Sequence, residues 1–235
     1  MATNTRAAAA GAALAGLAVH AGPALAQRSA PLRTLLGVRA RLDDPAAVAL
    51  TFDDGPHPQG TPAILEALAR GGATATFFLA GEQVRRHPSL AREIVAAGHR
   101  VGVHCDRHRN LLRLTPRQVR TDLDRAVDAI GAATGAELRH YRPPYGVLTA
   151  AALAHAARRG WEPVLWSRWG RDWRGAATPA SVLAEATAGL RGGDILLLHD
   201  ADDYGARGCW KATVGALPAI LARISAGRLQ PRALA

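Results

Sequence analysis

Between residues 48 and 225 the chain alternates short apolar runs with segments of helical periodicity, and this alternation limits the folds open to it. The apolar runs that predict strands fall at 48–52, 75–79, 100–104, 138–142, 163–166 and 195–198. The helical segments fall at 61–70, 88–97, 116–134, 149–159, 179–190 and 214–225. Strands that alternate with helices indicate parallel β/α construction, either an open sheet or a barrel. No linker of biased composition interrupts the pattern, so we expect a single domain at 46–235.

The first 26 residues have the layout of a secretory signal peptide. A short positive start at Arg6 precedes an apolar stretch that ends in small residues at Ala26. The stretch is shorter than the roughly 20 apolar residues of a membrane span, and Pro23 interrupts it. We therefore expect cleavage near Ala26, a secreted or periplasmic location, and no stable membrane insertion after cleavage. Residues 27–45 are then an N-terminal extension of the domain.

The net charge of +10 favours anionic partners such as cell-wall polymer, nucleic acid or a membrane surface. The basic residues are scattered along the chain, however, and no recognised nucleic-acid motif or clustered basic stripe accompanies them. We therefore expect no nucleic-acid partner.

Polar side chains that can carry chemistry follow the predicted strands. The groups are Asp53 and Asp54 after the first strand, His104 and His108 after the third, Arg142 after the fourth, the segment 166–173 after the fifth, and His199 and Asp200 after the sixth. In parallel β/α folds the C-terminal ends of the strands meet on one face, where active sites are built. The pattern therefore predicts a single site.

Three of these side chains form a ligand set for a metal ion. One carboxylate, Asp54, and two neutral imidazoles, His104 and His108, suit zinc or a similar divalent metal and leave positions open for water and substrate. Two solvated aspartates in a turn, and two histidines lining a polar face, are the alternatives for each motif taken alone. Together the three residues favour metal binding.

Five segments resemble the motifs of the polysaccharide deacetylases of carbohydrate esterase family four, which share the chitooligosaccharide deacetylase homology domain. The segments are TFDDGP at 51–56, HCDRH at 104–108, RPPYG at 142–146, the tryptophan-rich stretch 166–173, and LLLHD at 196–200. They occur in the family's order and the resemblance covers residues 46 to 225. It implies a distorted (β/α) barrel of seven strands that hydrolyses an acetamide with the help of a metal.

The resemblance also implies roles for the residues of the first three motifs. Asp54, His104 and His108 would hold the metal, with zinc expected and cobalt or nickel as alternatives. Asp53 would be the general base toward the attacking water. Arg142 would lie beside Asp53 and keep it ionised and oriented.

By the same resemblance, His199 would be the general acid that protonates the departing sugar amine. The backbone N–H of Tyr145 would stabilise the oxyanion. Trp166, Trp173 and Leu198 would form the apolar wall that receives the acetyl methyl group.

The chain departs from the family pattern at Trp169, where the family carries an aspartate that tunes the acid. Three alternatives remain open from the sequence: Asp172 takes over this role, Asp200 takes it over, or the pKa of His199 is lower and the pH profile is altered.

The second motif carries Cys105 where serine or threonine is usual. The only other cysteine, Cys209, follows the sixth strand and could approach the same face. Export would permit a disulfide between the two, and two unpaired thiols are the alternative.

These observations predict a metal-dependent hydrolase that removes acetyl groups from N-acetylated sugars of peptidoglycan, chitin oligosaccharide or an exopolysaccharide. Its partner would be the glycan polymer or oligosaccharide, and the protein itself would be a monomer. An O-acetyl esterase acting on a xylan-like polymer is a second reading. A catalytically impaired glycan-binding protein is a third, favoured by Trp169 alone.

Overall fold

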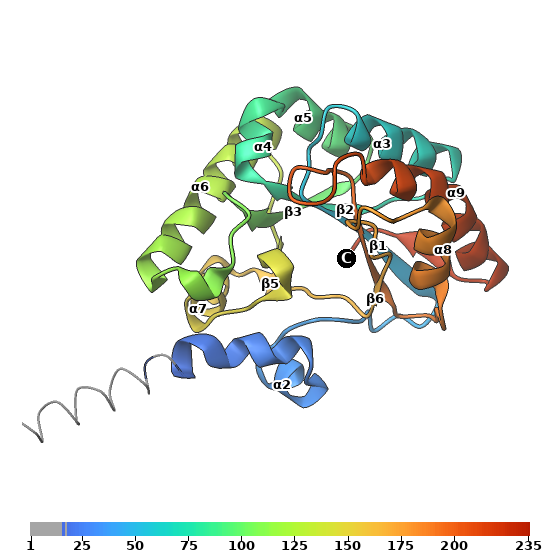
Figure 1. The fold of residues 1–235 in the computed structure, drawn as a ribbon. Coiled ribbons are helices and arrows are strands. Elements are labelled where there is room, and N and C mark those ends of the chain that lie inside the picture. The colour runs from blue at the N-terminus through green and yellow to red at the C-terminus, as the bar shows by residue number, and fades with distance from the viewer. Residues whose placement is uncertain (1–15, 17) are drawn as a thin grey trace, which may run out of the picture.

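The computed structural model describes residue 16 and residues 18–235. At its centre lies a curled sheet of parallel strands surrounded by helices in one domain, so the predicted distorted (β/α) barrel is confirmed (Figure 1). The strand order is β5-β4-β3-β2-β1-β7-β6, and β8 pairs with β1 beside this seven-stranded path. The strands are β1 Ala47–Asp53, β2 Thr76–Ala80, β3 Arg100–Cys105, β4 His140–Tyr141, β5 Glu162–Pro163, β6 Arg168–Trp169, β7 Ile195–His199 and β8 Gln230–Arg232.

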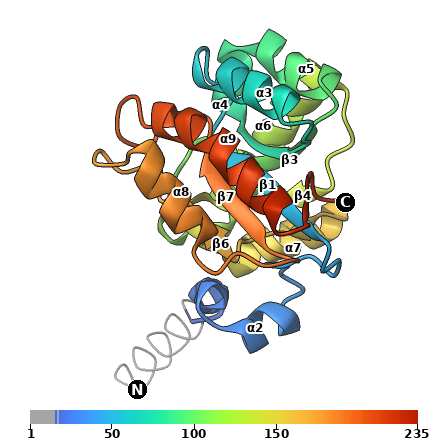
Figure 2. The ribbon, with the colours of Figure 1, turned by 90° about the vertical axis from the view of Figure 1, so that its right-hand side faces the viewer.

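Helices cover the outside of the sheet. They are α3 Gly60–Arg70, α4 Gly81–Arg86, α5 Pro88–Ala96, α6 Pro116–Thr134, α7 Ala150–Arg159, α8 Pro179–Thr187 and α9 Trp210–Ala226. Figure 2 shows α9 lying across β1 and α8 beside it. The sheet side of these helices is apolar: Ile64 and Leu68 of α3 and Ile220 of α9 are fully buried in the same core as Phe52 of β1. Removing these large side chains from water is the main stabilising contribution to the barrel.

Local sequence fixes where the longer helices begin and end. The Thr115 hydroxyl accepts a hydrogen bond from the backbone N–H of Gln118, the Gln118 side-chain oxygen accepts one from the backbone N–H of Thr115, and a proline occupies the first turn of α6. This capping box satisfies N–H groups that have no partner inside the helix. Gly135 ends α6 in the left-handed conformation, with φ of 63°. Glycine adopts that conformation without the steric cost of a Cβ atom.

The N-terminal extension is ordered and packs across the open side of the barrel. It contains α2 Ala30–Leu35, and a 3₁₀ helix, η1 Gly22–Gln27, precedes it and spans the predicted cleavage point. Beyond them, the backbone of Arg39 forms a β-bridge with Val164 and that of Arg41 forms one with Asp194, which ties the extension to the segments just after β5 and just before β7. Figure 1 shows this blue segment running below β5 and β6. Residues 1–15 and 17 of the expected signal peptide lie outside the described part of the chain. Among the described helices, none is both long and apolar enough to cross a bilayer.

Several elements differ from the sequence prediction. Helix α9 begins at Trp210, earlier than expected. Strands β4, β5 and β6 contain two residues each, and α4, β6 and β8 were not predicted. A strand of two residues is too short to show an alternating pattern of polar and apolar residues. Such strands form by pairing with neighbouring strands, and the local sequence does not reveal that pairing.

Candidate active site

The predicted metal ligands come together at the C-terminal edge of the sheet. Asp54 follows β1, His104 lies in β3, and His108 lies in the loop after β3. Asp54 Oδ1 lies 3.3 Å from His104 Nε2 and 3.5 Å from His108 Nε2. All three groups are largely buried, and their ligand atoms lie within 4.8 Å of one another.

The residues fit a divalent cation. Asp54 Oδ1 is a buried oxygen without a hydrogen-bond partner, a costly arrangement that a cation would relieve. The Nδ1–H of His104 donates to the carbonyl oxygen of Arg142 over 2.8 Å, which leaves the His104 Nε2 lone pair facing Asp54. This set of one carboxylate and two imidazoles is a recognised zinc ligand set with open positions.

The charges of the same residues support this fit. Burial raises the pKa of Asp54, but the close contact with His104 and the nearby imidazoles of His199 and His108 outweigh that effect and hold the pKa at about 2. Burial lowers the pKa of His108 to about 4, so its imidazole is neutral near pH 7. Burial also acts against protonation of His104, yet Asp54 and Asp53 raise its pKa overall. A proton and a metal therefore compete for the space between His104 and Asp54.

Asp53 and Arg142 form a buried ion pair beside the ligands. Arg142 Nη1 donates to Asp53 Oδ1 over 2.8 Å and to the Thr51 hydroxyl over 2.7 Å. The other guanidinium nitrogens donate to the carbonyl oxygens of Val164 and Leu165 over 3.3 and 3.1 Å. The Arg142 side chain is fully buried, so its charge acts on Asp53 with little screening by water. This pair fixes the orientation of the Asp53 carboxylate.

His199 is paired with Asp172 and not with Asp200. Its Nδ1–H donates to Asp172 Oδ1 over 2.8 Å, and its backbone N–H donates to Asp172 Oδ2 over 2.7 Å. The Thr213 hydroxyl donates to the same carboxylate over 2.6 Å. Burial alone would lower the pKa of His199. The negative charge and hydrogen bond of Asp172 outweigh burial, and the charges of Asp54 and Asp53 add to them, so the pKa rises to about 10. The imidazole is therefore a proton donor near neutral pH.

This pairing selects one of the three alternatives left open at Trp169. Asp172 carries the tuning role. Asp200 instead accepts a hydrogen bond from Thr61, and burial raises the pKa of Asp200 to about 7. Trp169 belongs to an aromatic row with Trp166 and Trp173, at ring-centroid distances of 6.0 and 5.6 Å.

A cavity of about 220 Å³ opens over these groups. Trp166 and Trp173 line it, as predicted. Its lining also includes residues that the sequence did not predict as binding residues, namely Gln27, Gly146, Trp169, Leu197 and Tyr204. The Tyr204 ring stacks on His108 with centroids 4.6 Å apart. A Cβ atom on Gly146 would lie 2.8 Å from the Trp166 ring, so a side chain there would push this wall inward.

The expectation that Leu198 lines the cavity is wrong. Leu198 is fully buried in the core on the helix side of β7, and Leu197 lines the cavity instead. Successive side chains of a strand point to opposite faces, so Leu197 shares the face of His199 and Leu198 does not.

Tyr145 lies at the rim of the cavity in a strained conformation. Its φ of 58° falls in the left-handed region, which is uncommon for a residue other than glycine. The side-chain amide of Gln27 donates to the Tyr145 carbonyl oxygen over 3.1 Å, so the N-terminal extension contacts this turn directly. The Tyr145 ring meets the His108 ring edge to face at 4.5 Å.

A disulfide between Cys105 and Cys209 is not formed, and the alternative of two free thiols is the observed one. Both side chains are buried, and Cys209 Sγ contacts the carbonyl oxygen of Ala201. Burial raises the pKa of both thiols, that of Cys209 to about 12. Neither thiol is therefore ionised near neutral pH, which disfavours metal ligation by either one.

Comparisons with known proteins agree with this geometry. A family model described as polysaccharide deacetylase matches residues 41–164. A chitooligosaccharide deacetylase of Bradyrhizobium sp. (strain ANU 289) is 41% identical over 171 residues, which cover 71% of this chain and 77% of the relative. A solved peptidoglycan N-acetylglucosamine deacetylase superimposes with a TM-score of 0.81 at 26% identity, covering 88% of this chain and 94% of that one. A family 4 carbohydrate esterase from Streptomyces lividans, in complex with acetate, superimposes with a TM-score of 0.71 at 31% identity, covering 79% and 91%.

Proposed function

We propose a substrate class and a mechanism for this chain, which belongs to the polysaccharide deacetylase family. The substrate is an N-acetylated sugar of a glycan such as peptidoglycan or chitin oligosaccharide, and the products are acetate and the free amine. The observation that carries this proposal is a buried carboxylate and a largely buried imidazolium, Asp53 and His199, that line one cavity together with the ligand set.

Asp54, His104 and His108 are the residues that would hold the metal, with zinc expected from the ligand types and cobalt or nickel as alternatives. When bound, a divalent cation supplies Lewis-acid polarisation of the acetyl carbonyl and acidifies the attacking water.

The chain's own residues perform the proton transfers. Asp53, oriented by Arg142, accepts a proton from the water as its oxygen attacks the acetyl carbon. The backbone N–H of Tyr145 donates to the oxygen on which negative charge develops. His199, kept protonated by Asp172, then donates its Nε2 proton to the sugar nitrogen as the carbon–nitrogen bond breaks. The acetyl methyl group lies against the aromatic row and Leu197.

Acetate release tests this proposal. Purified protein with zinc or cobalt is assayed on chitin oligosaccharides, on peptidoglycan fragments and on O-acetylated xylan. We expect release from an N-acetylated glycan that Asp53→Asn abolishes, because the amide cannot accept the proton. Asp43→Asn is the matched control, since Asp43 is 99% exposed and lies on the N-terminal extension. Release from xylan alone would favour the O-acetyl esterase reading, and no release from any substrate would refute the proposal.

The reading as an impaired glycan-binding protein loses its main support. It rested on Trp169 in place of a tuning aspartate, and Asp172 supplies that carboxylate. A base, an acid and a complete ligand set in one cavity favour turnover.

We also propose that the protein is exported and acts as a monomer outside the cytoplasm. The signal-like layout of residues 1–26 supports export, and glycan substrates of this kind are cell-wall or extracellular polymers. The intact mass of the chain recovered from the periplasm or medium tests this, with Gln27 expected as the first residue. A chain that retains Met1 would contradict cleavage, and a dimer in size-exclusion chromatography with light scattering would contradict the monomer.

A further inference from the structure

A second hollow adjoins the active-site cavity. It is an open groove of about 510 Å³, lined by His108, Arg109, Asn110, Arg113, Leu114 and Tyr145. His108 and Tyr145 line both the groove and the cavity, so the two are continuous across these rings. We call this hollow the arginine groove.

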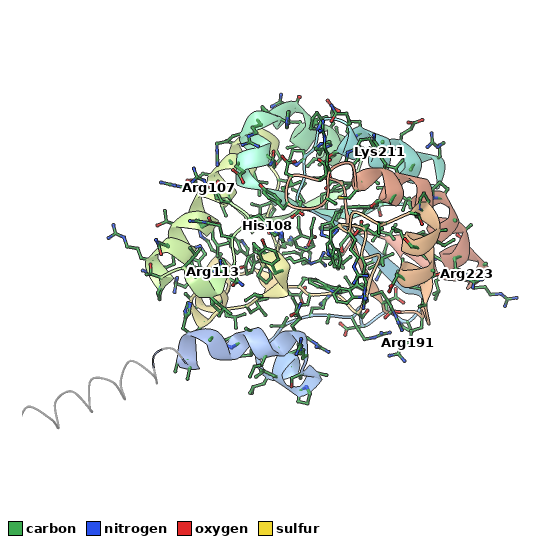
Figure 3. The ribbon with its side chains drawn as sticks, in the orientation of Figure 1. Arg107, His108, Arg113, Arg191, Lys211 and Arg223 are labelled. Carbon is green, nitrogen blue, oxygen red and sulfur yellow. The ribbon has the colours of Figure 1, made fainter. Side chains whose placement is uncertain are left out.

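The arginine groove carries positive charge that the protein only partly neutralises. Arg109 Nη2 pairs with Asp122 over 2.6 Å. Arg113 is exposed, and within the described part of the chain no carboxylate oxygen lies within 4.0 Å of its guanidinium nitrogens. Arg107, also exposed, adds charge close by; Figure 3 shows Arg107 and Arg113 on the α6 side of His108.

The backbone that presents Arg113 is held in place. Arg113 ends a 3₁₀ helix, η2 Leu111–Arg113, whose first residue is 1% exposed and anchored in the core. The Asn110 side chain accepts a hydrogen bond from the backbone N–H of Leu112 over 3.0 Å. The capping box at Thr115 then fixes the start of α6 just beyond. A binding group on such a support loses little conformational freedom in its backbone when a ligand arrives.

Tyr145 lies where the cavity meets the arginine groove, and its side chain is 54% exposed. The face of an aromatic ring suits the apolar CH face of a pyranose. A glycan that places its acetamide in the cavity would extend over Tyr145, and the substituents of the neighbouring sugar would then face Arg109 and Arg113.

We propose that the arginine groove is a subsite for a carboxylate carried by the sugar next to the one that is deacetylated. The planar guanidinium groups match a carboxylate in shape and charge. The inference rests on the proposed function, because that function places the acetamide in the cavity. It assigns a recognition role to Arg109 and Arg113, which neither transfer a proton nor bind the metal in the proposed mechanism.

The test compares one ligand in two forms. Disaccharide fragments of peptidoglycan carry a lactyl carboxylate on the muramic acid unit, and carbodiimide coupling converts this group to a neutral amide. Binding of both forms is measured by calorimetry with Asp53→Asn protein, in which turnover is removed. Acetate release from both forms is measured with otherwise unaltered protein. Each measurement is repeated with Arg113→Gln and with Arg223→Gln, a matched control that removes an exposed arginine on the far side of the molecule (Figure 3).

We expect the acidic form to bind about 1.5-fold to fivefold more tightly than the amide, as for an exposed charge pair. Arg113→Gln should remove most of this preference and Arg223→Gln should leave it unchanged, and about 0.5 M salt should weaken it. Equal binding of the two forms, or equal effects of the two substitutions, would overturn the inference. The acetate-release assay tests the proposed function. The binding comparison tests the subsite separately, because it uses a variant without turnover.

Discussion

Replacing Arg142 by methionine is predicted to destabilise the fold and abolish activity together. Methionine keeps the unbranched apolar stem of the side chain but removes the charge opposite Asp53, 2.8 Å away. Hydrogen bonds to the Thr51 hydroxyl and to the carbonyl oxygens of Val164 and Leu165 are lost as well. Breaking a buried pair by removing one partner costs about 3–5 kcal/mol, because it leaves an uncompensated buried charge. We expect a loss of that size in the free energy of unfolding, measured by urea denaturation.

A double-mutant cycle separates the ion pair from general damage to the core. If the cost of Arg142→Met comes from the carboxylate left behind, adding Asp53→Asn should restore at least about 1 kcal/mol. Arg223→Met, on the exposed face of α9, should change stability by less than about 0.5 kcal/mol. The reasoning fails if Arg142→Met costs under about 1 kcal/mol, or if the costs of the two active-site substitutions simply add.

Three further predictions follow from the site. In metal-free protein, Asp172→Asn should lower the pKa of His199 from about 10 toward or below its ordinary value of 6.5, as followed by NMR titration. Because the folded-state pKa is raised, protonation of His199 stabilises the fold fully below pH 6.5, and this contribution is lost progressively as the pH rises to about 10; an unchanged pKa would refute the pairing. Leu198→Ala should cost about 2–5 kcal/mol of stability with little change in KM, whereas Leu197→Ala should raise KM. Equal effects on KM would contradict the assignment of Leu197 to the cavity face of β7. Zinc at about a hundredfold excess over its Kd should raise unfolding stability by about 2.7 kcal/mol, and His104→Ala should remove this gain; a gain that survives would exclude His104 as a ligand.

The residues after the strands could be predicted from the sequence because their positions follow from chain order alone. Asp53, Asp54 and His104 each stand at the end of a buried apolar run, and parallel strands bring such ends to one edge. The family resemblance alone assigned Leu198 to the cavity wall, and the sequence of its strand, which is apolar on both faces, could not correct that assignment. In β7 the residues from Ile195 to Leu198 are all buried, so no alternation of polar and apolar residues indicates which face meets the cavity.

Other parts of the site depend on contacts between distant segments. Gln27 reaches Tyr145 across 118 positions of the chain, and Tyr204 stacks on His108 from a loop after β7. No local sequence pattern predicts contacts between segments so far apart in the chain. The partner of His199 could not be predicted for the same reason: Asp200 is its neighbour in sequence, whereas Asp172 lies 27 positions away and only the fold brings it to the imidazole.

The central claim is that hydrolysis requires a cation held by Asp54, His104 and His108. The most direct test is acetate release from an N-acetylated glycan by metal-free protein titrated with zinc, alongside His108→Ala. We predict no release without metal, a linear rise that ends at one zinc per chain, and no rise in the variant at that ratio. Full release by metal-free protein, or an unchanged titration in His108→Ala, would contradict the claim.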